Sequence, residues 1–335
     1  MKINLEDIPK NNTILKTFMV TDNKLNNDIY KNISVSISGG SDSDIVLDII
    51  TKTVKTEVLK KIKFVFFDTK LEYQATLKHL NYLEKKYNIH IERITPEMSI
   101  IETVRKFGQP CFSKNISKKI NLMQTKNIEF KNCSTDELCK KHGKVKDVAK
   151  WWNDEWSTNK NSQFNISKRR KLKRFLINNP PNFLISDKCC TYTKKIPVKK
   201  YYIENNIDIG ITGIRKNEGG IRSMSYKNSC FTDKCESNNY VASFRPLWNW
   251  TNEDKQIYKD FYKIKHSDCY EVYGMTRTGC AGCPFNLNLK KDLQILEKYE
   301  PNVHKAVCNI FKNAYDYIEQ YNSFRDLNIR GQKHG

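Results

Sequence analysis

The sequence predicts an α/β fold: a doubly wound, mostly parallel sheet with a helical insertion and a helical C-terminal region. Three observations lead to this prediction. Short β-branched runs alternate with helical patterns over roughly the first hundred residues, a polar segment then interrupts the alternation, and the end of the chain has helical spacing. Of 335 residues, 39% are hydrophobic and 11% aromatic, which is enough apolar side chain to build a core.

The first predicted strand covers residues 33–38 (ISVSIS), and a glycine turn and a helical pattern follow it directly. Residues 62–67 (IKFVFF) predict a second strand, 71–88 a helix, and 90–94 a third strand. Strands joined by helices at this spacing pair in parallel, and ligands bind such a sheet beyond the carboxyl ends of its strands. Gly39 and Asp68 fall at such ends.

The alternation stops in a Lys- and Asn-rich segment that carries Trp151, Trp152 and Trp156 and the basic run 168–174 (KRRKLKR). It resumes with a predicted strand over 207–212 and a helix near Thr251. We therefore divide the chain into a nucleotide-binding domain over 1–113, a basic insertion over 114–181, the second part of the nucleotide-binding domain over 182–265, and a helical region over 266–335.

The charge of the chain favours phosphate-bearing partners. Lys and Arg number 58 and Asp and Glu 37, which leaves a net charge of +21 and a pI near 9.4. An AT-rich coding bias would also enrich Lys, so composition alone leaves both explanations open. No apolar run approaches the about 20 residues that cross a bilayer, and the N-terminal residues do not resemble a signal peptide. We expect a cytoplasmic protein with no membrane partner.

The glycine turn after the first strand has the composition of a phosphate site. Residues 38–43 read Ser-Gly-Gly-Ser-Asp-Ser, so two glycines let the backbone approach an anion while helix-start amides and hydroxyls donate to it. The spacing of a Walker A loop is missing. An ordinary turn with a helix cap is the alternative, because Gly and Ser are common in both settings.

Four of the eleven cysteines form a pattern typical of a metal centre. Cys189 and Cys190 are adjacent, and Cys280 and Cys283 form a Cys-x-x-Cys half-site. Adjacent cysteines are awkward ligands for one tetrahedral zinc ion, whereas a cubane cluster offers four separate iron corners. We therefore favour a 4Fe-4S cluster over zinc. Buried reduced thiols are the remaining alternative.

Four ordered segments resemble a known family. The loop at 38–43 resembles the SGGxDS pyrophosphate loop of the PP-loop ATP pyrophosphatases. The segments 66–73 (FFDTKLEY), 213–222 (GIRKNEGGIR) and 245–258 (RPLWNWTNEDKQIY) resemble motifs of the phosphoadenosine phosphosulfate (PAPS) reductase-like branch. The order of the four cysteines is similar to that in adenylyl sulfate (APS) reductases and in the PP-loop subunit of DNA phosphorothioation systems.

The resemblance implies an ATP, APS or PAPS site with Mg²⁺. It implies nucleotide binding by Ser38, Gly39, Gly40, Ser41, Asp42, Ser43, Asp68, Thr69, Arg215, Glu218 and Arg222, and a catalytic set of Asp42, Ser43, Arg215 and Arg222. Asp42 would cap the helix and hold Mg²⁺. The two arginines also suit an anion chemically, since guanidinium forks match phosphate, although surface charge is the alternative. Ser41 stands where the reductase branch has Lys, which removes one cation from the phosphate site.

The sequence predicts a PP-loop, 4Fe-4S enzyme that cleaves ATP between its α and β phosphates and activates a substrate for sulfur transfer. The known reductase nucleophile, a cysteine in a C-terminal Glu-Cys-Gly-x-His element, has no counterpart after Cys308. The basic run and the tryptophans suit a nucleic-acid acceptor, although helix packing and a solvated face explain them equally well. A sulfur-donor protein such as a cysteine desulfurase, or a thiol reductant, would be a partner. The alternatives are a sulfonucleotide reductase with an atypical thiol such as Cys111 or Cys230, and a degenerate nucleotide- or nucleic-acid-binding subunit.

Overall fold

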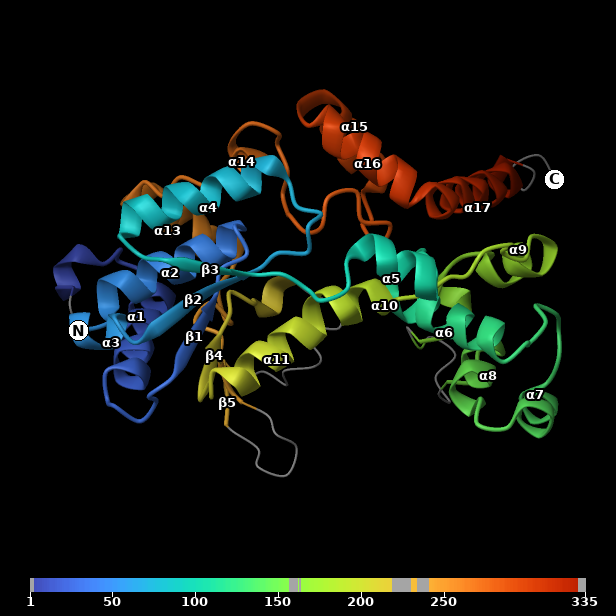
Figure 1. Cartoon of the computed structure of the whole chain (residues 1–335), viewed down its shortest axis with the longest axis horizontal. Coiled ribbons are helices and arrows are strands. Elements are labelled where there is room, and N and C mark those ends of the chain that lie inside the picture. Colours follow the sequence, from blue (N-terminus) through green and yellow to red (C-terminus); the bar gives the residue numbers. More distant parts are fainter. Residues whose placement is uncertain (1–2, 157–161, 163, 219–229, 234–240, 331–335) are drawn as a thin grey trace. The chain divides into compact units, whose positions relative to one another are not determined.

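The computed structural model describes residues 3–156, 162, 164–218, 230–233 and 241–330. The chain forms two compact units, which are described separately below (Figure 1). Unit 1 comprises Met1–Glu97 and Lys194–Cys280, and unit 2 comprises Met98–Thr193 and Ala281–Gly335. The predicted insertion over 114–181 therefore lies within unit 2, together with the C-terminal helices.

Unit 1 is built on a six-stranded sheet of order β3-β2-β1-β4-β6-β5. All neighbouring strands pair in parallel except β5 with β6, which pair antiparallel at the edge. The predicted doubly wound, mostly parallel sheet is thus confirmed. The strands are β1 Ile33–Ser36, β2 Ile62–Phe67, β3 Ile91–Ile94, β4 Ile209–Ile211, β5 Phe231–Thr232 and β6 Ala242–Phe244.

The central strands form where the sequence is continuously apolar. Val35 of β1 lies opposite Phe64 of β2, and both side chains are buried. Strands covered on both faces need such runs, because neither face meets water. The helices of unit 1 are α1 Asn12–Leu25, α2 Ser41–Thr53, α3 Thr56–Leu59, α4 Gln74–Tyr87, α11 Ile196–Glu204, α13 Asn252–Tyr262 and α14 Asp268–Glu271, with short turns η1 Leu5–Asp7 and η4 Lys216–Glu218.

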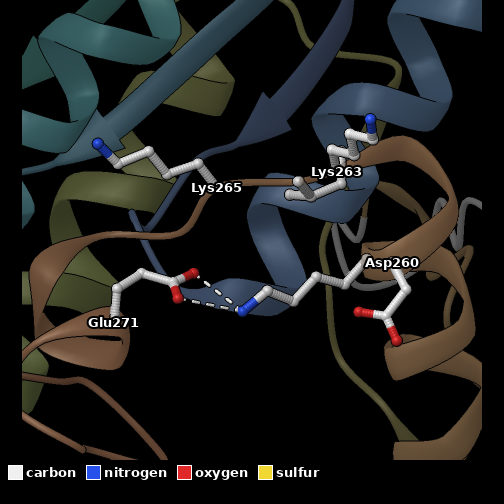
Figure 2. Close-up of a pocket in the computed structure, with 6 residues that line it drawn as sticks. Asp260, Lys263, Lys265 and Glu271 are labelled. Atoms are coloured by element: carbon white, nitrogen blue, oxygen red, sulfur yellow. Dashed lines mark hydrogen bonds and ion pairs between the residues drawn. The ribbon is translucent and has the colours of Figure 1, made fainter.

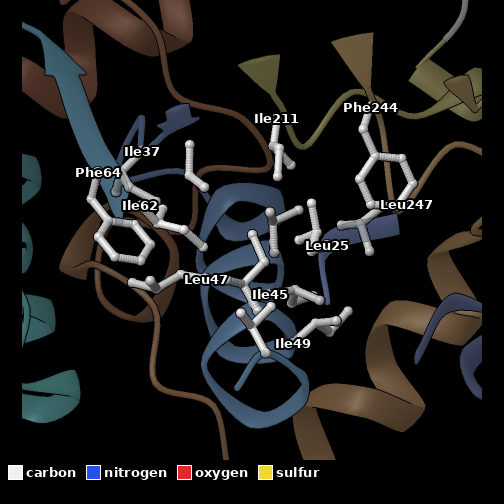
Figure 3. Close-up of a cluster of buried hydrophobic side chains, with 14 of the residues drawn as sticks. Leu25, Ile37, Ile45, Leu47, Ile49, Ile62, Phe64, Ile211, Phe244 and Leu247 are labelled. Carbon is white, nitrogen blue, oxygen red and sulfur yellow. The ribbon is translucent and has the colours of Figure 1, made fainter. Parts of the chain in front are cut away.

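The core of unit 1 surrounds α2. Figure 3 shows Ile45 and Leu47 of this helix among apolar side chains of the sheet, including Phe64, Ile211 and Phe244. Ten of the thirteen residues of α2 are buried, so the helix is enclosed on nearly all sides. Packing on this scale fixes the position of the first turn of α2, which follows the predicted phosphate loop.

Unit 2 is helical in its described part, apart from a parallel bridge between Gln109 and Ile185. This confirms the predicted change from alternating strands and helices to helices alone. None of the described helices of the chain is long and apolar enough to cross a membrane. The elements of unit 2 are α5 Ile100–Phe107, α6 Lys114–Thr125, α7 Thr135–His142, α8 Lys146–Trp152, α9 Leu172–Asn178, α10 Lys188–Cys190, α15 Leu289–Tyr299, α16 Pro301–Ile310 and α17 Lys312–Arg330, with the 3₁₀ turn η2 Ile166–Lys168; the π-helical segment η3 Thr191–Lys195 crosses the boundary between the units.

Two of the three tryptophans in the insertion are core residues. Trp151 and Trp152 at the end of α8 are buried, and the indole nitrogen of Trp152 donates to the Lys131 carbonyl oxygen at 3.0 Å. Between base stacking and helix packing, the structure supports packing for this pair. Trp156 is half-buried, with Lys119 Nζ 4.4 Å from its ring centroid.

We expect Trp152→Ala to destabilise the protein by about 3–5 kcal/mol, because it leaves a large cavity and removes the partner of the Lys131 carbonyl. Urea unfolding followed by circular dichroism measures this change. Trp156→Ala is the matched control, since it removes a half-buried ring, and its expected cost is smaller. Equal costs for the two variants would contradict the assignment of Trp152 to the core.

Candidate functional site

The predicted phosphate loop connects β1 to α2 in unit 1. Gly39 adopts φ +66°, a left-handed conformation that favours glycine, and a Cβ there would lie 2.6 Å from Thr76 Cγ2. The hydroxyl of Ser43 donates to the Gly40 carbonyl oxygen at 2.8 Å and accepts from the backbone nitrogen of Ser38 at 3.2 Å. These bonds hold a compact loop at the N-terminus of a buried helix.

Gly40, and not Asp42, is the N-cap of α2, so the expectation that Asp42 caps the helix is wrong. Asp42 is the second residue of the helix, and its carboxylate oxygen Oδ1 lies 3.1 Å from Arg215 Nε and 2.6 Å from Lys255 Nζ. The structure thus brings two of the predicted site residues, Asp42 and Arg215, into direct contact.

Arg215 reaches the loop because its own segment passes close to α2. A Cβ on Gly213 would lie 2.9 Å from the Asp42 carbonyl carbon, so only glycine allows this approach. Arg215 also donates from Nη1 to the side-chain oxygen of Asn252 at 3.1 Å, and its side chain is 8% exposed. A guanidinium held this firmly is a preorganised charge.

Lys255 is the site residue that the sequence did not reveal. It lies on α13, and its Nζ donates to Ser41 Oγ at 2.9 Å as well as pairing with Asp42. Ser41 is the position where the resembling reductases carry a loop lysine, so a lysine from a distant helix places its ammonium group there. The available signal was the position of Lys255 in the family-like segment 245–258.

Two further side chains lie against the loop from the segment that follows α13. A Cβ on Gly40 would meet Tyr270 Oη at 3.2 Å and Thr278 Oγ1 at 3.3 Å. These two hydroxyl groups are 3.0 Å apart and hydrogen-bonded. Neither residue belongs to a motif, and both add hydroxyl groups beside the predicted phosphate position.

The end of β2 joins the predicted nucleotide residues to one of the predicted cluster cysteines. The Thr69 hydroxyl donates to Glu72 Oε1 at 2.6 Å, and its oxygen lies 3.6 Å from Cys280 Sγ. Asp68 accepts from the Lys70 backbone nitrogen at 2.7 Å. Burial raises the pKa of Glu72, and the positive charge of Lys194 opposes that shift only in part.

The four predicted cluster cysteines are divided between the units. Cys280 is the last residue of unit 1, and the other three belong to unit 2. Cys189 and Cys190 lie on α10 with their sulfur atoms 4.0 Å apart, and Cys283 follows Gly282, which has φ +59°. In the part of the chain that the structure describes, no group of three or more His, Cys, Asp or Glu side chains is arranged to hold a metal ion.

The structure does not describe the side chains of two predicted nucleotide-binding residues, Glu218 and Arg222. Arg222 lies outside the described residues. Glu218 ends the turn η4, and its side chain is likewise outside them. Their roles stay predictions of the sequence.

The left-handed Gly39 allows a prediction with a matched control. We expect Gly39→Ala to destabilise unit 1 by about 1–2 kcal/mol through its positive φ, and by about 1–3 kcal/mol more through the contact with Thr76. Gly274→Ala has nearly the same φ, +67°, and no atom within 4 Å of the new Cβ. Urea unfolding should give Gly274→Ala the smaller loss, and equal losses would contradict the tight packing of the loop.

In the first turn of α2, the buried carboxylate of Asp44 contacts two buried histidines. Asp44 Oδ2 accepts from His79 Nε2 at 2.9 Å and from His266 Nδ1 at 2.8 Å, and all three residues are buried. Burial alone would raise the pKa of Asp44. The hydrogen bonds and positive charge of His266 and His79 outweigh burial, so the pKa lies below its ordinary value of 3.8.

A pH dependence follows from Asp44. Because its folded pKa is lowered, its stabilising contribution is complete above the ordinary value of 3.8 and is lost as the pH falls through the folded pKa. We expect the free energy of unfolding to fall as the pH drops below about 4, and to fall less in Asp44→Asn. Urea titrations at several pH values measure both slopes. Identical slopes would exclude Asp44 as the source.

A separate cavity of about 430 Å³ in unit 1 contains none of the predicted site residues. Figure 2 shows Glu271 in its charged lining. Lys259 Nζ donates to the two carboxylate oxygens of Glu271 at 2.9 and 3.2 Å. Asp260, Lys263 and Lys265 also line it. The lining of this cavity carries charges of both signs, and Lys259 is already paired with Glu271. The cavity therefore lacks the cationic character of a nucleotide site.

Comparison with known proteins gives a family match over most of the chain. Residues 32–135 and 147–286 match the phosphoadenosine phosphosulfate reductase domain. An uncharacterized protein of Methanocaldococcus jannaschii is 28% identical over 261 residues, which cover 76% of this chain and 37% of the relative. The chain thus spans little more than a third of the length of that curated relative.

Two solved structures are similar in part. The PAPS reductase of Candida auris, solved as a phosphate complex, superposes with a TM-score of 0.40 at 15% identity over 75% of this chain and 82% of its own. The U34-tRNA thiolase NcsA of Methanococcus maripaludis, solved with its [4Fe-4S] cluster, has a TM-score of 0.37 at 13% identity over 94% and 80%.

Proposed function

Because the chain belongs to the phosphoadenosine phosphosulfate reductase family, whose members are PP-loop enzymes, we propose that unit 1 binds ATP at residues 38–43 and cleaves it between the α and β phosphates. The observation that carries this proposal is the convergence of Arg215 and Lys255 on Asp42 beside the loop. Two cations and the amides of a glycine-rich helix start are the donors that a leaving pyrophosphate requires.

In the proposed reaction, an oxygen atom of the acceptor attacks the α-phosphorus of ATP. A new phosphorus–oxygen bond forms, the α–β phosphoanhydride bond breaks, and pyrophosphate leaves. Hydrosulfide then attacks the activated carbon, and AMP departs with the oxygen. If the persulfide of a donor protein attacks instead, AMP departs in the same way, and a thiol reductant must then cleave the resulting disulfide to leave the sulfur on the acceptor. We propose a nucleic acid as the acceptor because the chain has a net charge of +21.

The residues have separate roles in this proposal. Arg215 and Lys255 neutralise the charge that develops on the β and γ phosphates, and Asp42 positions both of them. Ser38, Ser43 and the backbone amides of the loop donate to phosphate oxygens. Mg²⁺, when bound, would neutralise further charge on the pyrophosphate; its assignment to Asp42 stays a prediction, because Asp42 Oδ1 is shared by two cations.

We propose that Cys189, Cys190, Cys280 and Cys283 hold a 4Fe-4S cluster. The donor set fits this group, since all four residues are thiols, the soft ligands that iron–sulfur clusters and zinc select. When bound, the cluster would bind or deliver the transferred sulfur. The contact of Thr69 with Cys280 supports a link between the two sites, because it joins a proposed nucleotide residue to a proposed ligand within unit 1.

The products formed from labelled ATP test the proposal. We expect AMP and pyrophosphate in anaerobic reactions with Mg²⁺ and a nucleic acid. ADP and phosphate, or no turnover with any DNA or RNA, would contradict an ATP pyrophosphatase. No turnover combined with nucleotide binding would instead favour a degenerate nucleotide-binding subunit.

The sulfonucleotide reductase alternative lacks support from Cys111, one of its two candidate thiols. Cys111 is fully buried, and burial raises the pKa of its thiol, so it is neither accessible nor readily ionised. Cys230 is half-buried and directly precedes β5. Release of sulfite from APS or PAPS under anaerobic, reducing conditions, lost in Cys230→Ala, would restore this alternative.

A further inference from the structure

Unit 2 contains a cavity of about 530 Å³ with a strongly basic lining. None of the proposed nucleotide or cluster residues lines it. Its five basic residues are Arg169, Arg170, Lys171, Lys173 and Arg174, and its single acidic residue is Asp154. Arg170 and Arg174 are exposed and the other three are half-buried, so most of the basic run lies around one open hollow.

No acidic side chain in the described part of the chain neutralises the positive charges around this cavity through an ion pair. None of the five basic side chains forms an ion pair with any described acidic residue, and the Asp154 carboxylate accepts a hydrogen bond from the Ser167 backbone nitrogen at 2.9 Å. Desolvation and the like charges of Arg170 and Arg174 lower the pKa of Lys171. A bound anion would relieve this repulsion.

Two of the basic residues, Lys173 and Arg174, lie on α9, and the other three directly precede this helix. Leu172, Phe175 and Leu176 of α9 are fully buried, so the helix is held by the core of unit 2. Lys173 Nζ lies 5.2 Å from the ring centroid of the buried Trp152 and donates to Asn153 Oδ1 at 3.3 Å. A fixed cationic surface binds anions with less loss of side-chain entropy than a mobile one.

We propose that this cavity binds the phosphodiester backbone of a nucleic-acid strand, independently of base sequence. Guanidinium and ammonium groups are the usual partners of phosphodiester oxygens. No described aromatic side chain lines the cavity, and Trp151 and Trp152 are buried, so no platform for base stacking is present there. This inference rests on the proposed function in one respect, namely that the bound strand would be the acceptor.

The test compares two variants that each remove three positive charges from unit 2. Arg170→Gln/Lys171→Gln/Arg174→Gln changes the cavity. Lys140→Gln/Lys141→Gln/Lys144→Gln changes three exposed lysines that do not line it. Fluorescence anisotropy with a labelled single strand of about 20 nucleotides of mixed sequence, without ATP and at several salt concentrations, measures affinity. Circular dichroism and thermal unfolding confirm that both variants are folded.

We expect the cavity variant to lose at least about 10-fold in affinity and to reduce the slope of log affinity against log salt by about 2–3, whereas the lysine control changes each much less. Equal losses in both variants would overturn the proposal. So would displacement of the strand by inorganic phosphate at a matched phosphate concentration, which indicates a small-anion site. Cavity-dependent binding to phosphatidylserine vesicles with unchanged strand binding would also overturn it.

Failure of the cavity inference can be distinguished from failure of the proposed ATP cleavage. Binding of ATP, measured without nucleic acid, should be unchanged in the cavity variant, because its three residues lie outside unit 1. If the wild-type protein binds the strand through the cavity and does not cleave ATP, the cavity is confirmed as a binding site, and the proposal that the bound strand is the acceptor is contradicted. If ATP is cleaved and the cavity variant binds the strand as the wild type does, only the inference about the cavity falls.

Discussion

Replacing Lys255 by methionine will lower the rate of ATP cleavage to pyrophosphate by about 100-fold. The reason is the position of Nζ, 2.9 Å from Ser41 Oγ and 2.6 Å from Asp42 Oδ1, where it can neutralise charge on the leaving phosphates. Methionine keeps the length and apolar stem of the side chain and removes only the charge and the donor. The rate of pyrophosphate release at saturating ATP, and the ATP concentration at half-maximal rate, measure the effect.

A second substitution can separate a chemical role of Lys255 from a structural one. If its ammonium group replaces the loop lysine of the resembling reductases, Ser41→Lys in the Lys255→Met background should restore part of the lost rate. The same substitution in the wild-type protein should not raise the rate, because two ammonium groups would then compete for one position. A lysine needed only for folding would not be replaced from another segment of the chain.

Lys259→Met is the matched control for this series. Lys259 lies four residues further along α13 and pairs with Glu271 in the cavity of Figure 2, away from the loop residues. Its loss should leave ATP cleavage within about two-fold of the wild type, because a surface ion pair contributes little. Unchanged cleavage in Lys255→Met, or an equal loss in Lys259→Met, would contradict the role given to Lys255.

The fold was predictable because its signals are local. The run at 62–67 became β2 Ile62–Phe67, and the pattern after Gly40 became α2, since a continuously apolar strand and a helical spacing can each be identified without knowing their neighbours. The prediction for 71–88 was less exact, because α4 begins at Gln74 after the loop that holds Asp68 and Thr69. Such boundaries depend on contacts of the preceding loop, which cannot be identified from the hydrophobic periodicity of the helix.

The site was predictable only where a motif carried it. Gly39 and Arg215 have expected roles in their motifs, whereas Lys255 lies in the family-like segment 245–258 with no such role and reaches Ser41 from 214 residues further along the chain. The expected cap at Asp42 was wrong for a similar reason. A carboxylate near a helix start is an ordinary cap in isolation, and only the arrival of Arg215 and Lys255 in the fold draws Asp42 to them.

The double variant Cys280→Ala/Cys283→Ala will lose its iron. Purified without oxygen, the wild-type protein should contain about four irons and four sulfides per chain with broad visible absorbance, and the variant should contain almost none. Loss of two of four thiolate ligands leaves too few bonds to hold a cubane. Iron and sulfide analysis together with the absorbance spectrum measures this, and zinc in place of iron would contradict the proposed cluster.

The control for this variant is Cys133→Ala/Cys139→Ala, which removes the same number of thiols from the insertion and should retain the iron. The ATP assay then distinguishes the order of events. If iron-free protein still releases pyrophosphate and transfers no sulfur, adenylylation of the acceptor precedes the sulfur transfer that needs the cysteines. If pyrophosphate release is lost as well, the contact between Cys280 and Thr69 offers the physical explanation, because removing the thiol then disturbs the end of β2 where Asp68 and Thr69 are held.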